Sequence, residues 1–335
     1  MTSSNAPLKF LHPGWFTMVM GVAGLSLAWH RAEGLMGEMA SGIALVLGAL
    51  AALIFIVLAA GTLLRLQRHP EAWQEDLRHP VRHAFVATLP ISLMLLATVG
   101  VALFGPSAVA AGLWWVGSVG QLGVTFWVLA RWWQPKAQGG LQWPAVTPAL
   151  FIPIVGNVLA PLGGVPLGHE LWATAQLGVG VLFWPVVWTL LMARILVQGA
   201  WPDRLLPMNF IFIAPPAVVG LAVLQLGAPA QGGWLLWGMA LFVAAWVASL
   251  APRLRALPFA LPHWGVSFPL TALTALTLRL ATPGSALAVL GPLLLALSTL
   301  VILSLLMATW RGLRAGTLLA PEPVAAIVPV AAPAG

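Results

Sequence analysis

Long apolar stretches separated by short polar segments run the length of the chain. Ten of these stretches are long enough, at about 20 residues, to cross a hydrocarbon core of about 30 Å as helices. They cover residues 12–30, 38–66, 83–104, 107–133, 148–166, 170–198, 207–227, 231–250, 262–281 and 286–312. The pattern therefore predicts an all-α polytopic membrane protein with ten transmembrane helices.

The composition agrees with this class and excludes a soluble one. Of the 335 residues, 60% are hydrophobic and 7% are charged, whereas about a quarter of the residues in soluble domains are charged. Residues 1–11 are short and polar and lack a cleavable signal pattern, so the first apolar segment is expected to stay. We expect a cytoplasmic N-terminus at 1–11, a single membrane domain at 12–314 and a flexible, Ala/Pro-rich cytoplasmic tail at 315–335.

The basic residues predict the orientation. Only Arg31 and Arg279 fall in loops on one side of the ten segments, and the other thirteen lysines and arginines fall on the opposite side. Excess positive charge marks the cytoplasmic side, so both termini are predicted to be cytoplasmic. The net charge of +7 comes from scattered residues, and we expect no nucleic-acid partner. The partner implied by the composition is the lipid bilayer.

The longest polar segment lies at 65–83. Its charged residues are Arg65, Arg68, Glu71, Glu75, Asp76, Arg78 and Arg82. We interpret it as a solvated cytoplasmic connector with an amphipathic turn at the membrane surface. A regulatory or substrate-recruiting element is the alternative.

A proline step recurs in every odd-numbered segment. Proline lacks an N–H and clashes with the preceding turn, so it bends or breaks a helix. The steps contain Pro13 (followed by Gly14), Pro90, Pro153, Pro215 with Pro216, and Pro269. Broken helices are tolerated at membrane depth only where protein or a watery cavity satisfies the freed backbone groups. This favours five quasi-repeated helical hairpins around a central pore, with odd helices inside and even helices facing lipid. Ordinary packing kinks in a solid bundle remain the alternative.

The residues of enzymes and metalloproteins are missing. The chain has no cysteine, and its seven histidines lie at segment ends or in loops without metal-ligand spacing. No nucleophile motif and no phosphate-binding Gly-rich loop is present. We therefore expect no enzymatic activity, no catalytic residue, no metal and no cofactor.

The acidic residues limit what the chain would carry. All eight lie in loops, in the termini or at helix ends, so the segments hold no proton relay and no acidic ring. A neutral or anionic permeant fits better, with Thr271 as a source of a hydroxyl. Arg279 would pair with a carboxylate substrate, although a snorkelling interfacial arginine is the interpretation we prefer. Asn157 and Gln225 are interpreted as making helix–helix hydrogen bonds.

Four short motifs resemble the tellurite-resistance/dicarboxylate transporter family, which includes bacterial TehA, malate transporters and plant slow anion channels. They are His12-Pro13-Gly14-Trp15-Phe16 with Met20-Gly21, His79-Pro80-Val81-Arg82 before Phe85, Ala214-Pro215-Pro216-Ala217, and Trp264-Gly265-Val266-Ser267-Phe268-Pro269-Leu270. Together they span nearly the whole chain, from about residue 10 to residue 315.

The resemblance implies ten helices in five hairpins and a homotrimer with one pore in each protomer. It also implies that a phenylalanine of the ninth helix, here Phe268, plugs the pore. Independently of the family, Phe268-Pro269 is the one proline step led by an aromatic residue. The chain departs from the family at Gly265-Val266, where two aromatic residues are common. We expect looser packing behind Phe268 there.

These observations favour a passive anion channel of the bacterial plasma membrane (the inner membrane), gated by Phe268 and conducting chloride, nitrate or similar small anions or small carboxylates. The first alternative is a secondary carrier that exports C4-dicarboxylates such as malate, or tellurite. The second is a membrane scaffold that transports nothing.

Overall fold

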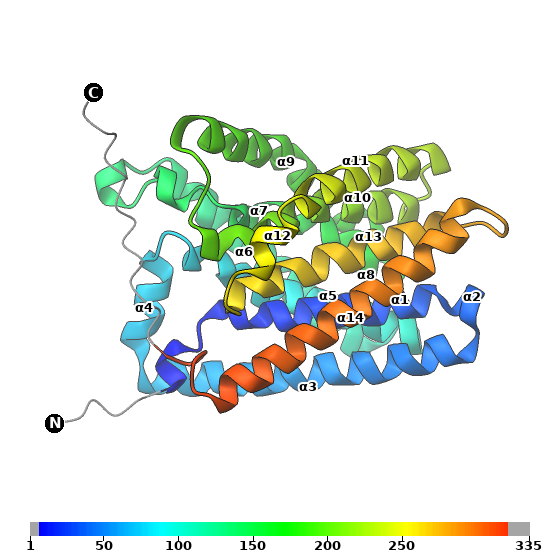
Figure 1. Cartoon of the computed structure of the whole chain (residues 1–335), viewed down its shortest axis with the longest axis horizontal. Coiled ribbons are helices and arrows are strands. Elements are labelled where there is room, and N and C mark those ends of the chain that lie inside the picture. Colours follow the sequence, from blue (N-terminus) through cyan, green and yellow to red (C-terminus); the bar gives the residue numbers. More distant parts are fainter. Residues whose placement is uncertain (1–6, 321–335) are drawn as a thin grey trace.

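The computed structural model describes residues 7–320 and is built from helices, with no strand among those residues (Figure 1). The α-helices are α1 (Thr17–Arg31), α2 (Glu33–Met36), α3 (Glu38–Arg68), α4 (Pro70–Arg78), α5 (Thr88–Phe104), α6 (Ala108–Trp132), α7 (Phe151–Val155), α8 (Ala160–Gly164), α9 (Glu170–Gln198), α10 (Ala214–Gln225), α11 (Ala230–Ala248), α12 (Ala251–Arg255), α13 (Ser267–Leu280) and α14 (Ala286–Arg314). The 3₁₀ segments are η1 (Pro7–Phe10), η2 (Pro13–Phe16), η3 (Arg82–Ala87), η4 (Lys136–Gln138), η5 (Trp143–Ala145), η6 (Pro148–Leu150), η7 (Gly156–Leu159), η8 (Asp203–Ile213) and η9 (Leu261–Val266).

Seven helical stretches within residues 7–320 are long and apolar enough to cross a membrane. They are α3, η3 with α5, α6, α9, η8 with α10, α11 and α14. Three expected segments are helical but broken or short: 12–30 divides into η2 and the 15-residue α1, 262–281 divides into η9 and the 14-residue α13, and 148–166 divides into four pieces.

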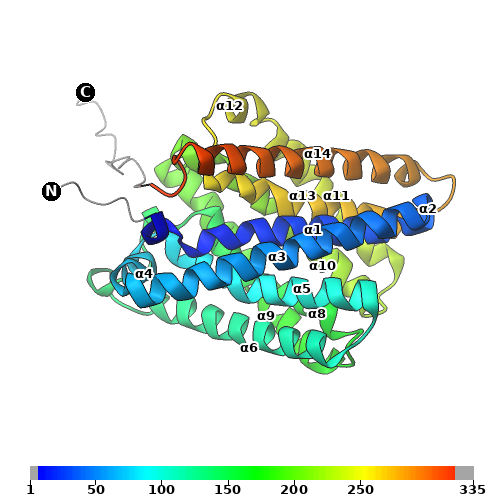
Figure 2. The ribbon, with the colours of Figure 1, turned by 90° about the horizontal axis from the view of Figure 1, so that it is seen from below.

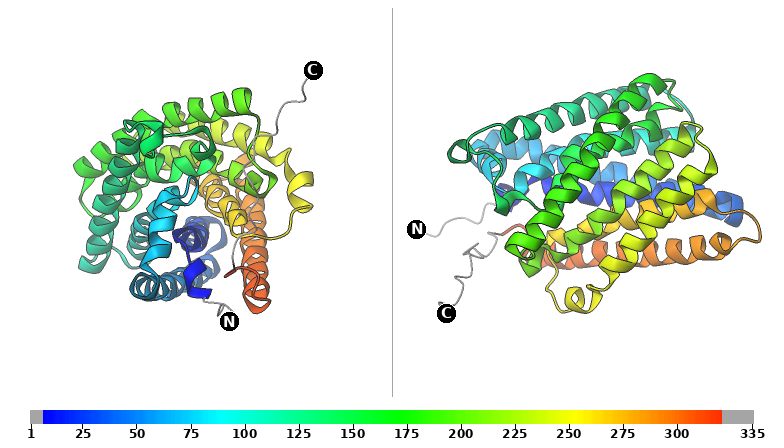
Figure 3. Two further views of the ribbon diagram at one scale, coloured as in Figure 1. Left: turned by 90° about the vertical axis from the view of Figure 1, so that its left-hand side faces the viewer. Right: turned by 90° about the horizontal axis from the view of Figure 1, so that it is seen from above.

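The helices fall into two groups by exposure. The apolar windows of η3–α5 and η8–α10 are 67% and 83% buried, against 22–33% for the windows of α3, α6, α9, α11 and α14. Each of those five helices presents large apolar side chains outward, for example Val46, Phe126, Leu182, Phe242 and Leu300. Seen along the helices in Figure 3, the colours run around the bundle in chain order. Exposed apolar faces of this extent are expected to contact lipid.

The buried segments share a local structure that the proline pattern did not specify. Each one starts as a 3₁₀ helix and then continues as an α-helix. The junctions are η2 to α1, η3 to α5, η6 to α7, η8 to α10, and η9 to α13. Pro90, Pro215 and Pro269 all stand in the first turn of the α-helix that follows the junction. A missing N–H costs no intrahelical bond at that position, so these prolines mark helix starts rather than mid-helix kinks.

Hydroxyl groups satisfy backbone carbonyls at three of these junctions. The hydroxyls of Thr17, Thr88 and Ser267 donate to the carbonyls of Gly14, Phe85 and Trp264, at 2.6, 2.6 and 2.7 Å. Each donor is the first residue of its α-helix and each acceptor lies three residues earlier. The side chains thus fix the 3₁₀ geometry in a buried place where water does not supply the bond.

Two glycines of α1 allow α13 to lie close to it. A Cβ added at Gly21 would stand 2.6 Å from Cβ of Ser267, and a Cβ added at Gly24 would stand 3.1 Å from Cδ2 of Phe268. In Figure 2, α1 and α13 lie behind the long helices α3 and α14, farther from the viewer. The approach of α1 to α13 therefore depends on the missing side chains.

We predict that Gly21→Ala destabilises the protein. The added methyl overlaps Ser267 and forces α1 and α13 apart, at a cost of about 1–3 kcal/mol. Gly42→Ala is the control, because Gly42 is exposed on α3 and a Cβ there meets nothing within 4 Å. Thermal unfolding in detergent measures both. Equal melting temperatures for the two variants would contradict the prediction.

Candidate functional site

A narrow cavity of about 60 Å³ lies where the five buried segments meet. Every one of these segments contributes to its lining. The lining residues are Thr17 and Met20; Ile91; Phe151, Ile152, Val155, Gly156, Val158 and Leu159; Ile211, Ala214, Pro215 and Val218; and Trp264, Gly265, Phe268 and Pro269. The segments expected to be odd-numbered spans therefore converge on one small space.

The lining of the narrow cavity is apolar and uncharged. Thr17 carries its only side-chain hydroxyl, and that hydroxyl donates to the Gly14 carbonyl at 2.6 Å. The indole N–H of Trp264 points away from the cavity and donates to Oγ1 of Thr309 on α14 at 2.9 Å. A hydrated ion would meet no charged or free hydrogen-bonding side chain here. A constriction of this kind excludes ions by size and by dewetting.

Phe268 is the second residue of α13 and lies in the wall of the narrow cavity, 9% exposed. Gly24 of α1 lies beside its ring. Behind it, a Cβ added at Gly265 would stand 3.3 Å from Cα of Met208. The backbone of η8 thus occupies part of the space that an aromatic side chain at 265 would take. The small residue brings η8 close to η9, where we expected looser packing.

The predicted kink and pore residues divide between several environments. Pro215 and Pro269 line the narrow cavity. Gly14 lines a second, wider cavity. Pro13, Pro90, Pro153 and Pro216 are buried and belong to the lining of neither. Pro90 faces α6, since a Cβ added at Gly120 would stand 3.3 Å from its Cβ.

Thr271 and Arg279 lie away from both cavities. The Thr271 hydroxyl is fully buried and donates to the Phe268 carbonyl at 2.9 Å, facing Gly24 of α1. Its hydroxyl is thereby used within α13. Arg279 is exposed near the C-terminal end of α13 and makes no ion pair within residues 7–320.

A buried polar network surrounds the break in the third buried segment. Gln121 of α6 donates to the carbonyls of Ile152 and Pro153, both at 3.0 Å. Asn157 donates to Thr125 at 2.7 Å and accepts from Gln176 at 2.9 Å. The interpretation of Asn157 as a helix–helix hydrogen bond is confirmed. The role of Gln121 was missed, although a glutamine inside an apolar segment was a usable signal.

The wide cavity holds about 660 Å³ and adjoins the narrow one, with Thr17, Ile211 and Gly265 common to both linings. It lies at the end of the bundle that carries α4, which we call the α4 end. Among the described residues its lining is basic: it contains Lys9, Arg65, Arg82 and Arg204, and Glu75 is the one carboxylate. The lining also includes His12 and His79. Within the structured region, no three His, Cys, Asp or Glu side chains gather as metal ligands.

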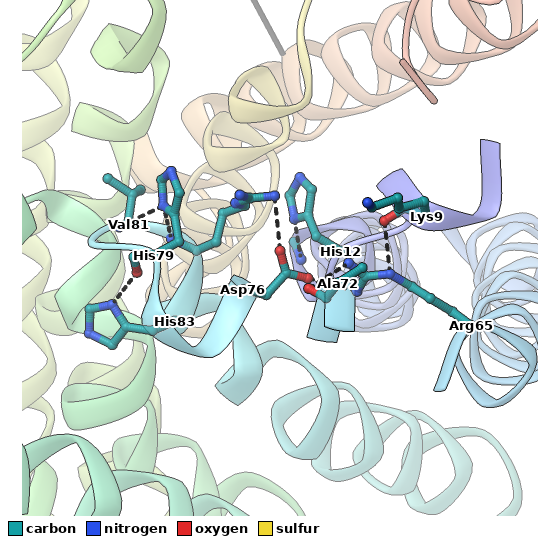
Figure 4. Close-up of polar contacts among 10 residues, drawn as sticks. Lys9, His12, Arg65, Ala72, Asp76, His79, Val81 and His83 are labelled. Atoms are coloured by element: carbon teal, nitrogen blue, oxygen red, sulfur yellow. Dashed lines mark hydrogen bonds and ion pairs between the residues drawn. The ribbon is translucent and has the colours of Figure 1, made fainter. Parts of the chain in front are cut away.

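Asp76 fixes the connector at the edge of this cavity (Figure 4). Its carboxylate pairs with Nη1 of Arg65 at 2.7 Å and with Nη1 of Arg82 at 2.9 Å, and it is fully buried. Arg65 also donates to the carbonyls of Lys9 and Ala72. Our expectation of a solvated connector is wrong for these residues. The amphipathic α4 turns Asp76 inward, and a buried carboxylate is stable only when paired.

His79 begins the chain that leads from α4 into η3. Its Nδ1 accepts the N–H groups of Val81 and Arg82, both at 3.1 Å. Burial, together with the smaller effect of the nearby charges of Arg82 and Arg204, lowers the pKa of His79 from 6.5 to about 4. The ring is neutral at pH 7, and its proton is on Nε2.

Helices with outward apolar faces around a buried set of broken helices define a multi-pass membrane protein. A sequence model of the voltage-dependent anion channel family, SLAC1, matches residues 10–310. The chain therefore belongs to the voltage-dependent anion channel family.

Individual relatives agree with this assignment. The chain is 26% identical over 271 residues to the tellurite resistance protein TehA homolog of Haemophilus influenzae, covering 78% of this chain and 79% of that protein. It is 26% identical over 239 residues to the S-type anion channel SLAH2 of Arabidopsis thaliana, covering 70% of this chain and 46% of the relative. It is also 26% identical over 259 residues to SLAH3 of the same plant, covering 76% and 40%. The chain thus spans less than half the length of these plant relatives.

We predict that stability falls as the pH drops from about 6.5 to about 4, partly because of His79. Unfolded His79 takes up a proton in this range and folded His79 does not, so its contribution is complete above the unfolded pKa and is lost on acidification. His79→Asn keeps an acceptor for the two N–H groups and should reduce the acid dependence. His69→Asn is the control, because His69 caps no backbone N–H. Melting temperatures across this pH range test it, and an unchanged slope in His79→Asn would refute it.

Proposed function

We propose that this protein is a passive anion channel in which Phe268 closes a central pore. The observation that carries the proposal is the narrow cavity. All five broken segments line it, the described lining residues carry no charge, and Phe268 lies in its wall. The adjoining wide cavity is basic, and it would concentrate anions before the constriction. The plant relatives are named S-type anion channels, which supports the same function.

The proposed architecture is a single membrane domain at 12–314, with ten helices in five hairpins around the pore. The odd helices line the pore, and their breaks include Pro13, Gly14, Pro90, Pro153, Pro215, Pro216 and Pro269, with Thr271 behind the gate. The deep burial of η3–α5 and η8–α10 beside the outward apolar faces of the other five long helices supports this arrangement. We place the protein in the bacterial inner membrane with both termini cytoplasmic, because the basic residues gather on that side. The homotrimer rests on the family resemblance.

The proposed permeants are small anions such as chloride and nitrate. An apolar throat provides steric closure but no substrate-binding side chain, and this favours a channel over an alternating-access carrier for dicarboxylates or tellurite. Arg279 is a proposed anion contact at the opposite mouth from α4. The function requires neither an enzymatic step nor a cofactor.

We predict that Phe268→Ala raises anion conductance in proteoliposomes or oocytes by roughly tenfold or more, because removing the ring widens and wets the throat. Phe242→Ala is the matched control: Phe242 is 72% exposed on α11 and contributes to neither cavity. Anion-substitution recordings on equal amounts of protein measure the change. Unaltered currents in a well-expressed Phe268→Ala protein would exclude the gate, and saturable, proton-coupled flux would favour the carrier.

A further inference from the structure

Arg65 and Arg82 both line the wide cavity, but they differ in their exposure and in their bonding partners. Arg65 is 1% exposed, and its three nitrogens all have partners: Nε meets the Lys9 carbonyl, Nη2 the Ala72 carbonyl and Nη1 the Asp76 carboxylate. Arg82 shares the same carboxylate through Nη1 at 2.9 Å. Arg82 is therefore the less enclosed of the two guanidiniums.

Arg82 also reaches the cavity surface. Its side chain is 25% exposed and lines the wide cavity together with Lys9 and Arg204. Asp76, which neutralises part of its charge, is fully buried and does not line the cavity. Among residues 7–320, the cavity lining therefore carries more positive than negative side chains, with Glu75 as the one carboxylate.

The rings of two histidines, His12 and His79, also line this wall. Nδ1 of His79 accepts the N–H groups of Val81 and Arg82, and Nδ1 of His12 accepts the N–H of Gly14 at 3.1 Å. A neutral ring that accepts at Nδ1 carries its hydrogen on Nε2. In Figure 4 the rings of His12 and His79 extend to the same side of the connecting chain, while His83 points away. Both rings line the cavity, and the Nε2–H of His79 is a donor on its wall.

We propose that the wide cavity contains a binding site for one small anion, a halide, nitrate or carboxylate, held between the Arg82 guanidinium and the Nε2–H of His79. A guanidinium and a neutral imidazole N–H form charge-assisted and neutral hydrogen bonds to such an anion. The site lies at the α4 end, before the Phe268 constriction, and this inference deepens the proposed channel function by naming where the permeant first binds.

The site also accounts for the unequal numbers of positive and negative side chains in the cluster formed by Arg65, Asp76 and Arg82. Two guanidiniums share one carboxylate, so one positive charge in the Arg65–Asp76–Arg82 cluster stays uncompensated. Both arginines line the cavity, and Arg82 is the more exposed of the two. A bound anion would complete the neutralisation of the cluster.

Chloride binding to purified full-length protein in detergent tests the site, with the protein-induced broadening of the ³⁵Cl NMR line as the readout. We expect Arg82→Gln and His79→Asn each to weaken chloride binding by about tenfold, the effect of one lost hydrogen bond to the anion. Arg78→Gln is the matched control, because Arg78 is exposed on α4 and does not line the cavity. Nitrate or malate should displace the chloride from the wild-type protein.

The inference is overturned if both cavity variants broaden the line as the wild type does, if Arg78→Gln weakens binding equally, or if neither nitrate nor malate displaces chloride. Should Arg82→Gln fail to fold, His79→Asn decides, because it keeps the acceptor for the N–H groups of Val81 and Arg82 and removes Nε2–H. Conductance separates this test from that of the proposed function. If the wild type binds chloride, both variants lose this binding and no form conducts, the site is supported and the channel is refuted. If the wild type conducts and both variants bind chloride as it does, the site alone is refuted.

Discussion

The interior of this protein must satisfy backbone polar groups without water. An α-helix does so by itself, but each of the five buried segments changes from 3₁₀ to α geometry and frees carbonyls in apolar surroundings. The chain supplies a side-chain donor where the break occurs. Hydroxyls serve the junctions that begin α1, α5 and α13, and Gln121 serves the carbonyls of Ile152 and Pro153. The narrow cavity exists because the segments that meet there are held in this broken form.

Periodicity and proline position predicted much of this arrangement. Apolar runs identified the helical segments, and the proline steps identified the ones that are broken. The sequence did not show that the prolines fall in first turns, because a proline is compatible with both a kink and a helix start. A finer signal was present: Thr88 and Ser267 each stand two residues before the proline of the step. A hydroxyl at that spacing caps the 3₁₀ turn before the α-helix begins.

The connector shows where sequence reasoning failed. Arg65, Asp76 and Arg82 read as surface charges in a polar stretch, and they meet only because α4 folds back between α3 and η3. No local pattern encodes that return. Breaking a buried ion pair by removing one partner costs about 3–5 kcal/mol, so this cluster is part of the fold as well as of the cavity wall. The close packing at Gly265 was not predictable from the sequence either, because it depends on the distant backbone at Met208.

The lining of the wide cavity is held in place by ion pairs on one part and is mostly apolar on another. One wall is clamped, because Asp76 ties the end of α3, the helix α4 and the start of η3 into one body. Another part of the lining is formed by residues 257–262 and by Thr317, Leu318 and Ala320, which are mostly apolar. Leu318 folds back against Gly312 of α14 there. The part of the lining that Asp76 holds by ion pairs is therefore the more rigid one. We expect any change in the width of the entrance to come from movement of the apolar part.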